Sequence, residues 1–168
     1  MKRRVYEILI EPRGQTYQAL LSAALRWCDQ FLLVDVPEPD FGPNDSAFRG
    51  RARSLIDQLA PYLVEVSKQK SWPGSTLSER KGVDVYARVY RFRLVPESTM
   101  ILSGSADGLY SWRAPAMPSD LSLLRKGGDP WLVNMAADEE SYLVVTQEEA
   151  EELLVAAPGL KIKEQYEH

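Results

Sequence analysis

The chain has 168 residues, with 20 Lys and Arg against 24 Asp and Glu, so its formal net charge is −4. Hydrophobic residues make up 45% of the chain and charged residues 26%, which is the balance of an ordinary globular protein. These values exclude a disordered, collagen-like or disulfide-rich protein, and the length fits one domain.

Two residue types that often carry chemistry are almost missing. Cys28 is the only cysteine, so no internal disulfide is possible, which suits a reducing compartment. His168 is the only histidine and is the last residue, so catalytic triads and histidine zinc sites have no ordered imidazole. The two commonest glycine-rich phosphate loops are also missing from the sequence. We therefore expect no catalytic constellation, no cofactor and no metal site.

The start of the chain does not read as an export signal. Lys2, Arg3 and Arg4 are followed by an apolar run, but Glu7 and Glu11 interrupt it. No stretch approaches the roughly 18 apolar residues that a membrane helix needs. The expected location is the cytoplasm, without contact to a membrane.

The first half of the chain alternates between two periodicities. β-Branched and aromatic runs indicate strands, and apolar residues spaced three and four apart indicate amphipathic helices. Cys28 falls on the apolar stripe of the first helix, as a small buried hydrophobe. The predicted strands cover residues 5–10, 31–36 and 62–66, and the predicted helices run from Thr16 to about Cys28 and from Asp45 or Ser46 to about Leu59.

The second half carries the clearest local signals. Residues 126–130, Lys-Gly-Gly-Asp-Pro, predict a hairpin between strands at 121–125 and 131–135. Thr146 and Glu149 form a capping box that opens a helix ending at Pro158. Residues 96–104 fit either a short helix or a hairpin arm. Further strands are predicted at 83–95, 142–145 and 160–163.

No segment has the composition of a linker between domains. The prediction is therefore a single α+β domain over residues 1–168, layered, with a mixed sheet and about three to four helices.

Charge is shared unevenly along the chain. Residues 1–95 carry a net charge of +4 and residues 96–168 a net charge of −8. Acids in the first turn of a helix ordinarily stabilise the helix dipole, and exposed acids ordinarily face solvent. A partner-binding role is the sharper hypothesis, because the acids gather in two short runs.

The leading hypothesis is a non-enzymatic module that binds another protein, of the immunity or adaptor type. Reversal of Glu148 and Glu149 to Lys is expected to weaken binding with little change in melting temperature. The identity of the partner is left open. The candidate binding residues are Asp138, Glu139, Glu140, Glu148, Glu149 and Glu152, with the turn-rich loops at Phe41 and Trp72.

A nucleic-acid or nucleotide binder is the first alternative. Tyr86, Arg88 and Tyr90 alternate onto one face of a predicted strand, where aromatic rings could stack on bases and Arg could meet phosphates. Arg49 and Arg53 on the second helix could extend this surface. Aromatic residues are also common strand formers that pack under helices. The net charge of −4 argues against a general nucleic-acid binder.

A carboxylate-based, metal-dependent hydrolase is the second alternative. It would use acids that fall in predicted loops or strand ends, although their spacing does not match a metal loop such as the EF-hand. Loop acids of this kind are routine in globular proteins. The residues are Asp107, Asp120, Asp129, Asp138, Glu139 and Glu140.

Short segments spread over most of the chain share a pattern with a known family. They are Tyr6–Pro12, Ala24-Leu25 with Cys28, Phe31–Val34, Trp72–Gly74, Leu109–Trp112, Asp120-Leu121 with Leu124-Arg125, Pro130–Leu132, and Glu139 with Tyr142. With these segments the chain resembles the small bacterial proteins labelled stage III sporulation protein AH. The resemblance implies a bacterial, cytosolic, single-domain protein. It carries over no catalytic residue, because the family often has Ala-His-Glu where this chain has Ala137-Asp138-Glu139.

Overall fold

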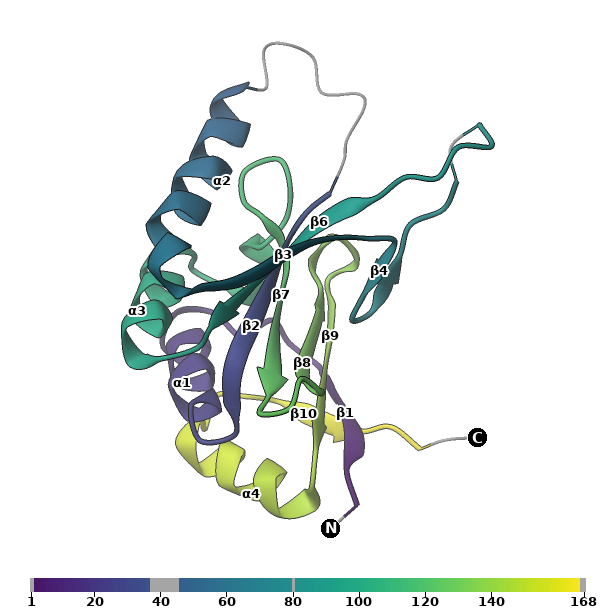
Figure 1. Cartoon of the computed structure of the whole chain (residues 1–168). Helices are drawn as coiled ribbons and strands as arrows, with labels where there is room; N and C mark the ends of the chain where they lie inside the picture. The colour runs from purple at the N-terminus through teal and green to yellow at the C-terminus, as the bar shows by residue number, and fades with distance from the viewer. Residues whose placement is uncertain (1, 37–45, 80, 167–168) are drawn as a thin grey trace.

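An antiparallel sheet of eight strands forms one layer of the molecule, and helices cover one of its two faces (Figure 1). The computed structural model describes residues 2–36, 46–79 and 81–166. Within these ranges it contains four α-helices, and all of them lie on the same side of the sheet. The predicted α+β class is confirmed. The mixed sheet is a correction: every strand pairing in the described ranges is antiparallel.

The strand order of the sheet is β10-β1-β9-β8-β7-β2-β6-β3. A separate two-stranded hairpin, β4 with β5, is inserted between β3 and β6. The strands are β1 Arg4–Ile8, β2 Cys28–Asp35, β3 Leu63–Gln69, β4 Ser71–Trp72, β5 Ser75–Thr76, β6 Ala87–Arg93, β7 Ser119–Arg125, β8 Pro130–Met135, β9 Glu140–Val145 and β10 Ile162–Glu164.

The sequence predicts the ends of some helices better than those of others. The capping box that opens α4 is confirmed, with Thr146 accepting from the Glu149 amide and Glu149 accepting from the Thr146 amide. The ambiguous segment 96–104 is a helix, and Pro96 occupies its first position, where a missing N–H costs nothing. The helices are α1 Gly14–Ala24, α2 Ser46–Leu59, α3 Pro96–Ser105 and α4 Gln147–Ala156, with 3-10 turns η2 Ala60–Tyr62, η3 Leu109–Ser111 and η4 Ala136–Asp138.

The first helix is shorter than its apolar spacing predicts. It begins at Gly14 and ends at Ala24, so Cys28 belongs to β2, where it pairs with Arg125 of β7. Trp27, in the connecting turn, stacks on Trp131 with ring centroids 5.8 Å apart. Pairing in the sheet therefore overrides the helical spacing of Cys28, although its predicted burial is confirmed at 5% exposure.

The main core fills the space between the sheet and the helices. Tyr17 of α1 is completely buried there, and its hydroxyl donates to the Leu102 carbonyl while accepting from the Trp112 indole. Phe31 and Phe92 stack across β2 and β6 with centroids 5.0 Å apart. The other face of β2 is also buried, because Leu32 and Val34 pack in a second, smaller cluster beneath the hairpin. Both faces of β2 are thus apolar, as its uninterrupted hydrophobic run indicates.

Candidate protein-binding face

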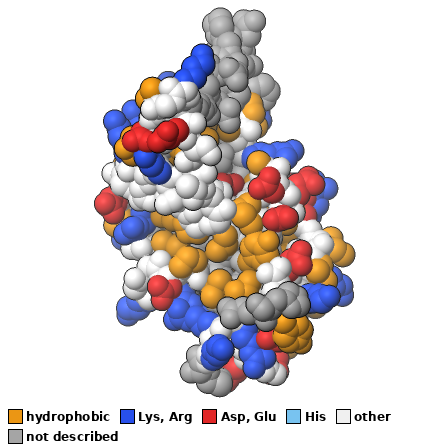
Figure 2. All heavy atoms as spheres, turned by 90° about the vertical axis from the view of Figure 1, so that its right-hand side faces the viewer, with side chains coloured by type: hydrophobic (Ala, Val, Ile, Leu, Met, Phe, Trp, Pro, Cys, Tyr) orange, Lys and Arg blue, Asp and Glu red, His pale blue; other side chains and the backbone are white. Residues whose placement is uncertain are grey.

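The face of the sheet that turns away from the helices exposes an apolar surface over β1, β9 and β8. In these strands Tyr6 and Leu143 pair and point into the core, so their neighbours point to the opposite face. Figure 2, which looks at the molecule from that side, shows hydrophobic side chains gathered at its centre. We call this surface the open patch; Val5 is exposed there at 37%, and Val133, Met135, Tyr142 and Val144 are half-buried.

The β4–β5 hairpin lies against one side of the open patch. Trp72 is buried at 8% exposure, and its indole Nε1 donates to Asp120 Oδ2 at 2.9 Å. Asp120 Oδ1 accepts from the amide of Ala136 at 3.1 Å, so one carboxylate ties the hairpin to the end of β8. Burial raises the pKa of Asp120 above its usual value, and the two hydrogen bonds oppose that shift. The predicted binding residue Trp72 is therefore a structural anchor of the hairpin.

The turn of the hairpin rests directly on the sheet. Gly74 has φ +86°, a conformation that glycine adopts easily. A Cβ atom at this position would come within 2.8 Å of side-chain carbons of Val133 and Met135. The hairpin and the sheet are therefore in close contact here, and the hairpin forms a fixed wall beside the open patch.

Acidic side chains border the open patch. Glu7 pairs with Tyr142 across β1 and β9, and Glu140 pairs with Met135 across β9 and β8, so both carboxylates lie on the open face. The Tyr142 hydroxyl donates to Glu140 Oε2 at 3.3 Å. Burial and the charge of Glu140 raise the pKa of this phenol. Lys163 of β10, which pairs with Glu7, adds one positive charge at the same edge.

Two further acids extend this border. Asp138 ends η4 and Glu139 follows it with φ +53°, and both are exposed in the turn that joins β8 to β9. The predicted residues Asp138, Glu139 and Glu140 therefore lie together at one end of the open patch.

The acids of α4 occupy a different part of the molecule. This helix covers the opposite face of the sheet from the open patch (Figure 1). Glu148 is exposed, and Glu152 pairs with Arg26 at 3.3 Å. The structure therefore divides the predicted acidic surface into two separate regions. Phe41, the remaining predicted binding residue, lies outside the described residues.

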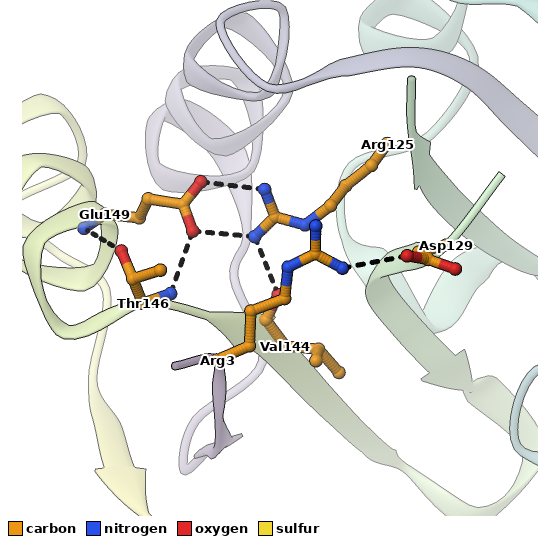
Figure 3. A network of polar contacts seen from close by, with 6 residues as sticks. All are labelled: Arg3, Arg125, Asp129, Val144, Thr146 and Glu149. Atoms are coloured by element: carbon orange, nitrogen blue, oxygen red, sulfur yellow. Dashed lines mark hydrogen bonds and ion pairs between the residues drawn. The ribbon is translucent and has the colours of Figure 1, made fainter. Parts of the chain in front are cut away.

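Glu149 faces inward and has internal partners. Figure 3 shows its carboxylate held by both terminal nitrogens of Arg125, at 2.7 and 2.8 Å. The Arg125 guanidinium also donates to the Val144 carbonyl at 2.9 Å, and the side chains of Arg125 and Glu149 are only 10% and 13% exposed. Burial alone would raise the pKa of Glu149, but the hydrogen bonds from Arg125 and Thr146 lower it. This pair joins β7 to the start of α4.

The strand face that carries Tyr86, Arg88 and Tyr90 is only partly exposed to solvent. Tyr90 is half-buried and stacks on Phe92 with centroids 6.2 Å apart, whereas Arg88 beside it is exposed. Tyr86 precedes β6 and is 48% exposed, with Lys70 Nζ 5.5 Å from its ring centroid. Arg53 is exposed on α2. The side chain of Arg49, although its backbone belongs to α2, lies outside the described residues.

The loop acids of the hydrolase alternative lie in different surroundings. Asp107 is exposed, Asp120 is buried against Trp72, and Asp129 forms an ion pair with Arg3 at 2.9 Å. Among residues 2–36, 46–79 and 81–166, no group of three or more His, Cys, Asp or Glu side chains is placed to hold a metal ion. The same residues include no helix that is both long enough and apolar enough to span a membrane.

The apolar residues of the open patch were not among the sequence candidates. The signal was present in the alternation of Val5 and Glu7 with Tyr6 and Ile8, which marks a strand with one core face and one open face. The sequence could not show that β8 and β9 would bring their own outward side chains to the same place, because that depends on strand order.

Comparison of the chain with models of protein families, with curated proteins and with solved structures gives no significant match, so the resemblance to the sporulation-labelled family stays a prediction.

Proposed function

We propose that this protein is a non-catalytic binding module that docks a partner protein on the open patch. The observation that carries the proposal is the face of the sheet that no helix covers in the described ranges, where apolar side chains of β1, β8 and β9 form one surface that the hairpin turn contacts at Val133 and Met135. Contiguous apolar surface with a polar border is typical of interaction sites. An immunity protein would use such a face to cover a surface of its partner. An adaptor would use it to hold its partner.

The charges around the open patch define the partner. Four acids, Glu7, Asp138, Glu139 and Glu140, stand beside it, and Lys163 adds a positive charge at the β10 edge. Complementary charge speeds association and selects partners. The occupant that fits is a basic protein surface that carries one or more apolar side chains at its centre. The resemblance noted above would place this partner in the bacterial cytoplasm.

The rigidity of the surface supports the same proposal. Most of the patch lies on paired strands, and the hairpin beside it is fixed by Trp72, Asp120 and the contact at Gly74. A surface that is already ordered loses little conformational entropy on binding. The open patch is therefore suited to a specific contact.

The test uses site-specific photo-crosslinking in the native cell. A benzoylphenylalanine at Tyr142 reports on the open patch, and one at Val155 of α4, which is 83% exposed, reports on the opposite face. We expect a discrete protein adduct from position 142 and none from position 155. The same adduct from both positions, or an adduct of nucleic acid at 142, would contradict the proposal.

Binding of the purified partner then tests the chemistry. Glu140→Lys and Val5→Asp should each raise the Kd about tenfold or more, while the control variants Glu148→Lys and Val155→Asp on α4 should leave it unchanged. The effect of Glu140→Lys should shrink at high salt, because rim charges are screened. Equal losses from patch and control variants would show that the partner does not use this face.

A further inference from the structure

A cavity of about 480 Å³ opens on the helix side of the molecule, away from the open patch. Three segments far apart in the sequence form its walls: α2, the end of α3, and the loop that follows η3. Small-molecule sites in proteins commonly have volumes of about 300–1,000 Å³. Its polar lining residues are Arg51, Ser105, Asp107, Ser111 and Arg113.

The lining carries more positive than negative charge. Arg51 comes from α2 and Arg113 from the loop after η3, and Asp107 supplies the one carboxylate of the lining. In the part of the chain that the structure describes, neither guanidinium lies within ion-pair distance of a carboxylate. A guanidinium presents a planar set of donors that matches the oxygens of a phosphate.

The loop that carries Arg113 is held firmly by its neighbours. Trp112 is completely buried, and its indole donates to the Tyr17 hydroxyl at 2.9 Å. The amide of Ala114 donates to Ser119 Oγ at 3.0 Å, and the amide of Met117 donates to the Arg113 carbonyl at 3.1 Å. Arg113 therefore extends from an ordered backbone, which lowers the entropy lost on binding a ligand.

We propose that this cavity binds a small phosphate monoester with a hydroxylated body, such as a sugar phosphate. A phosphate monoester carries a charge of about −1.5 to −2 near pH 7, which two guanidinium groups can match. The Ser111 hydroxyl provides a further donor, and the Asp107 carboxylate can accept from a hydroxyl of the ligand. This site is separate from the open patch, so either proposal can fail without the other.

Isothermal titration calorimetry tests the site with named probes at constant ionic strength. The probes are glucose 6-phosphate, glycerol 3-phosphate and inorganic phosphate, with glucose and glycerol as uncharged controls. We expect saturable binding of the phosphate monoesters, tightest for glucose 6-phosphate, and none of the uncharged compounds. Absence of saturable binding by both monoesters, or equal binding of glucose, would overturn the proposal.

Matched arginine variants locate the binding. Arg51→Gln and Arg113→Gln should each raise the Kd for glucose 6-phosphate about tenfold or more, because a hydrogen bond to a charged group contributes about 1.5–3 kcal/mol. Arg53→Gln, on the same helix but not part of the cavity lining, should leave the Kd unchanged. Ligand-induced NMR shifts at the Ser111 and Arg113 amides give an independent readout. Unchanged binding in Arg113→Gln, or shifts that avoid these amides, would place the phosphate elsewhere.

Discussion

Replacement of Glu149 by Gln tests whether the ion pair between β7 and α4 is a main support of the fold. The change keeps the shape of the side chain and an oxygen that can accept from the Thr146 amide, but it removes the charge that faces Arg125. Breaking a buried pair from one side typically costs about 3–5 kcal/mol, because the remaining charge stays buried. The guanidinium keeps its bond to the Val144 carbonyl, so we expect about 3 kcal/mol.

Urea unfolding followed by tryptophan fluorescence measures this loss directly. A loss of this size should also lower the melting temperature by roughly 6–12 °C in a chain of this length. The control is Glu152→Gln, which disrupts the pair with Arg26, whose two side chains are 46% and 62% exposed. That exposed pair should contribute less than about 1 kcal/mol.

Equal, small losses in Glu149→Gln and Glu152→Gln would refute the importance that we assign to burial of the Arg125 pair. Burial of the Arg125–Glu149 pair also changes one expectation from the sequence. Reversal of Glu149 to Lys would place two cations together inside the fold, so it should lower the melting temperature strongly, whereas reversal of Glu148 should not.

Three further predictions rest on single groups. The folded state lowers the pKa of Glu149, so its charge stabilises the fold at pH values above the ordinary pKa of 4.5. This stabilisation is lost as the pH falls through the pKa of the folded state. The difference in unfolding free energy between the wild type and Glu149→Gln, measured by urea unfolding, should therefore shrink in acid. Gly74→Ala should cost about 1–3 kcal/mol more than Gly127→Ala, since both glycines have positive φ but only Gly74 meets side chains of β8; equal calorimetric losses would contradict this contact. Burial raises the pKa of the Cys28 thiol, so Ellman's reagent should label it only as the protein unfolds, and fast labelling of the native protein would contradict its placement.

Local signals in the sequence predicted the elements whose cause is local. The Thr146–Glu149 capping box, the hairpin signal at 126–130 and the apolar run at 31–36 each correspond to an observed element. In each case a few neighbouring residues determine the local backbone conformation. The predicted end of α1 is wrong because Cys28 fits a helical spacing and also a strand pairing. Only the presence of β7 decides between the two.

The candidate site was predicted in part. The charge of Asp138, Glu139 and Glu140 marks them as candidates in the sequence, and the structure places them beside the open patch. The charge of Glu149 marks it in the same way, but that charge is matched by Arg125, which is 24 positions away in the sequence. Charge counts cannot tell a carboxylate that faces solvent from one that faces a buried guanidinium. That distinction requires the strand order, which no local pattern contains.

The position of β1 in the sheet has a consequence for how the protein folds during synthesis. Among the strands of the described residues its neighbours are β9 and β10, so Tyr6 must wait for Leu143 and Glu164 before its backbone is paired. Ribosomes add about 5–20 residues per second, so this early strand stays unpaired for several seconds while the helices and central strands emerge. Pairings between such distant positions also slow folding, because the loop must close before the contact stabilises it. The part of the sheet that carries Val5 and Tyr142 is therefore the last part of the open patch to form.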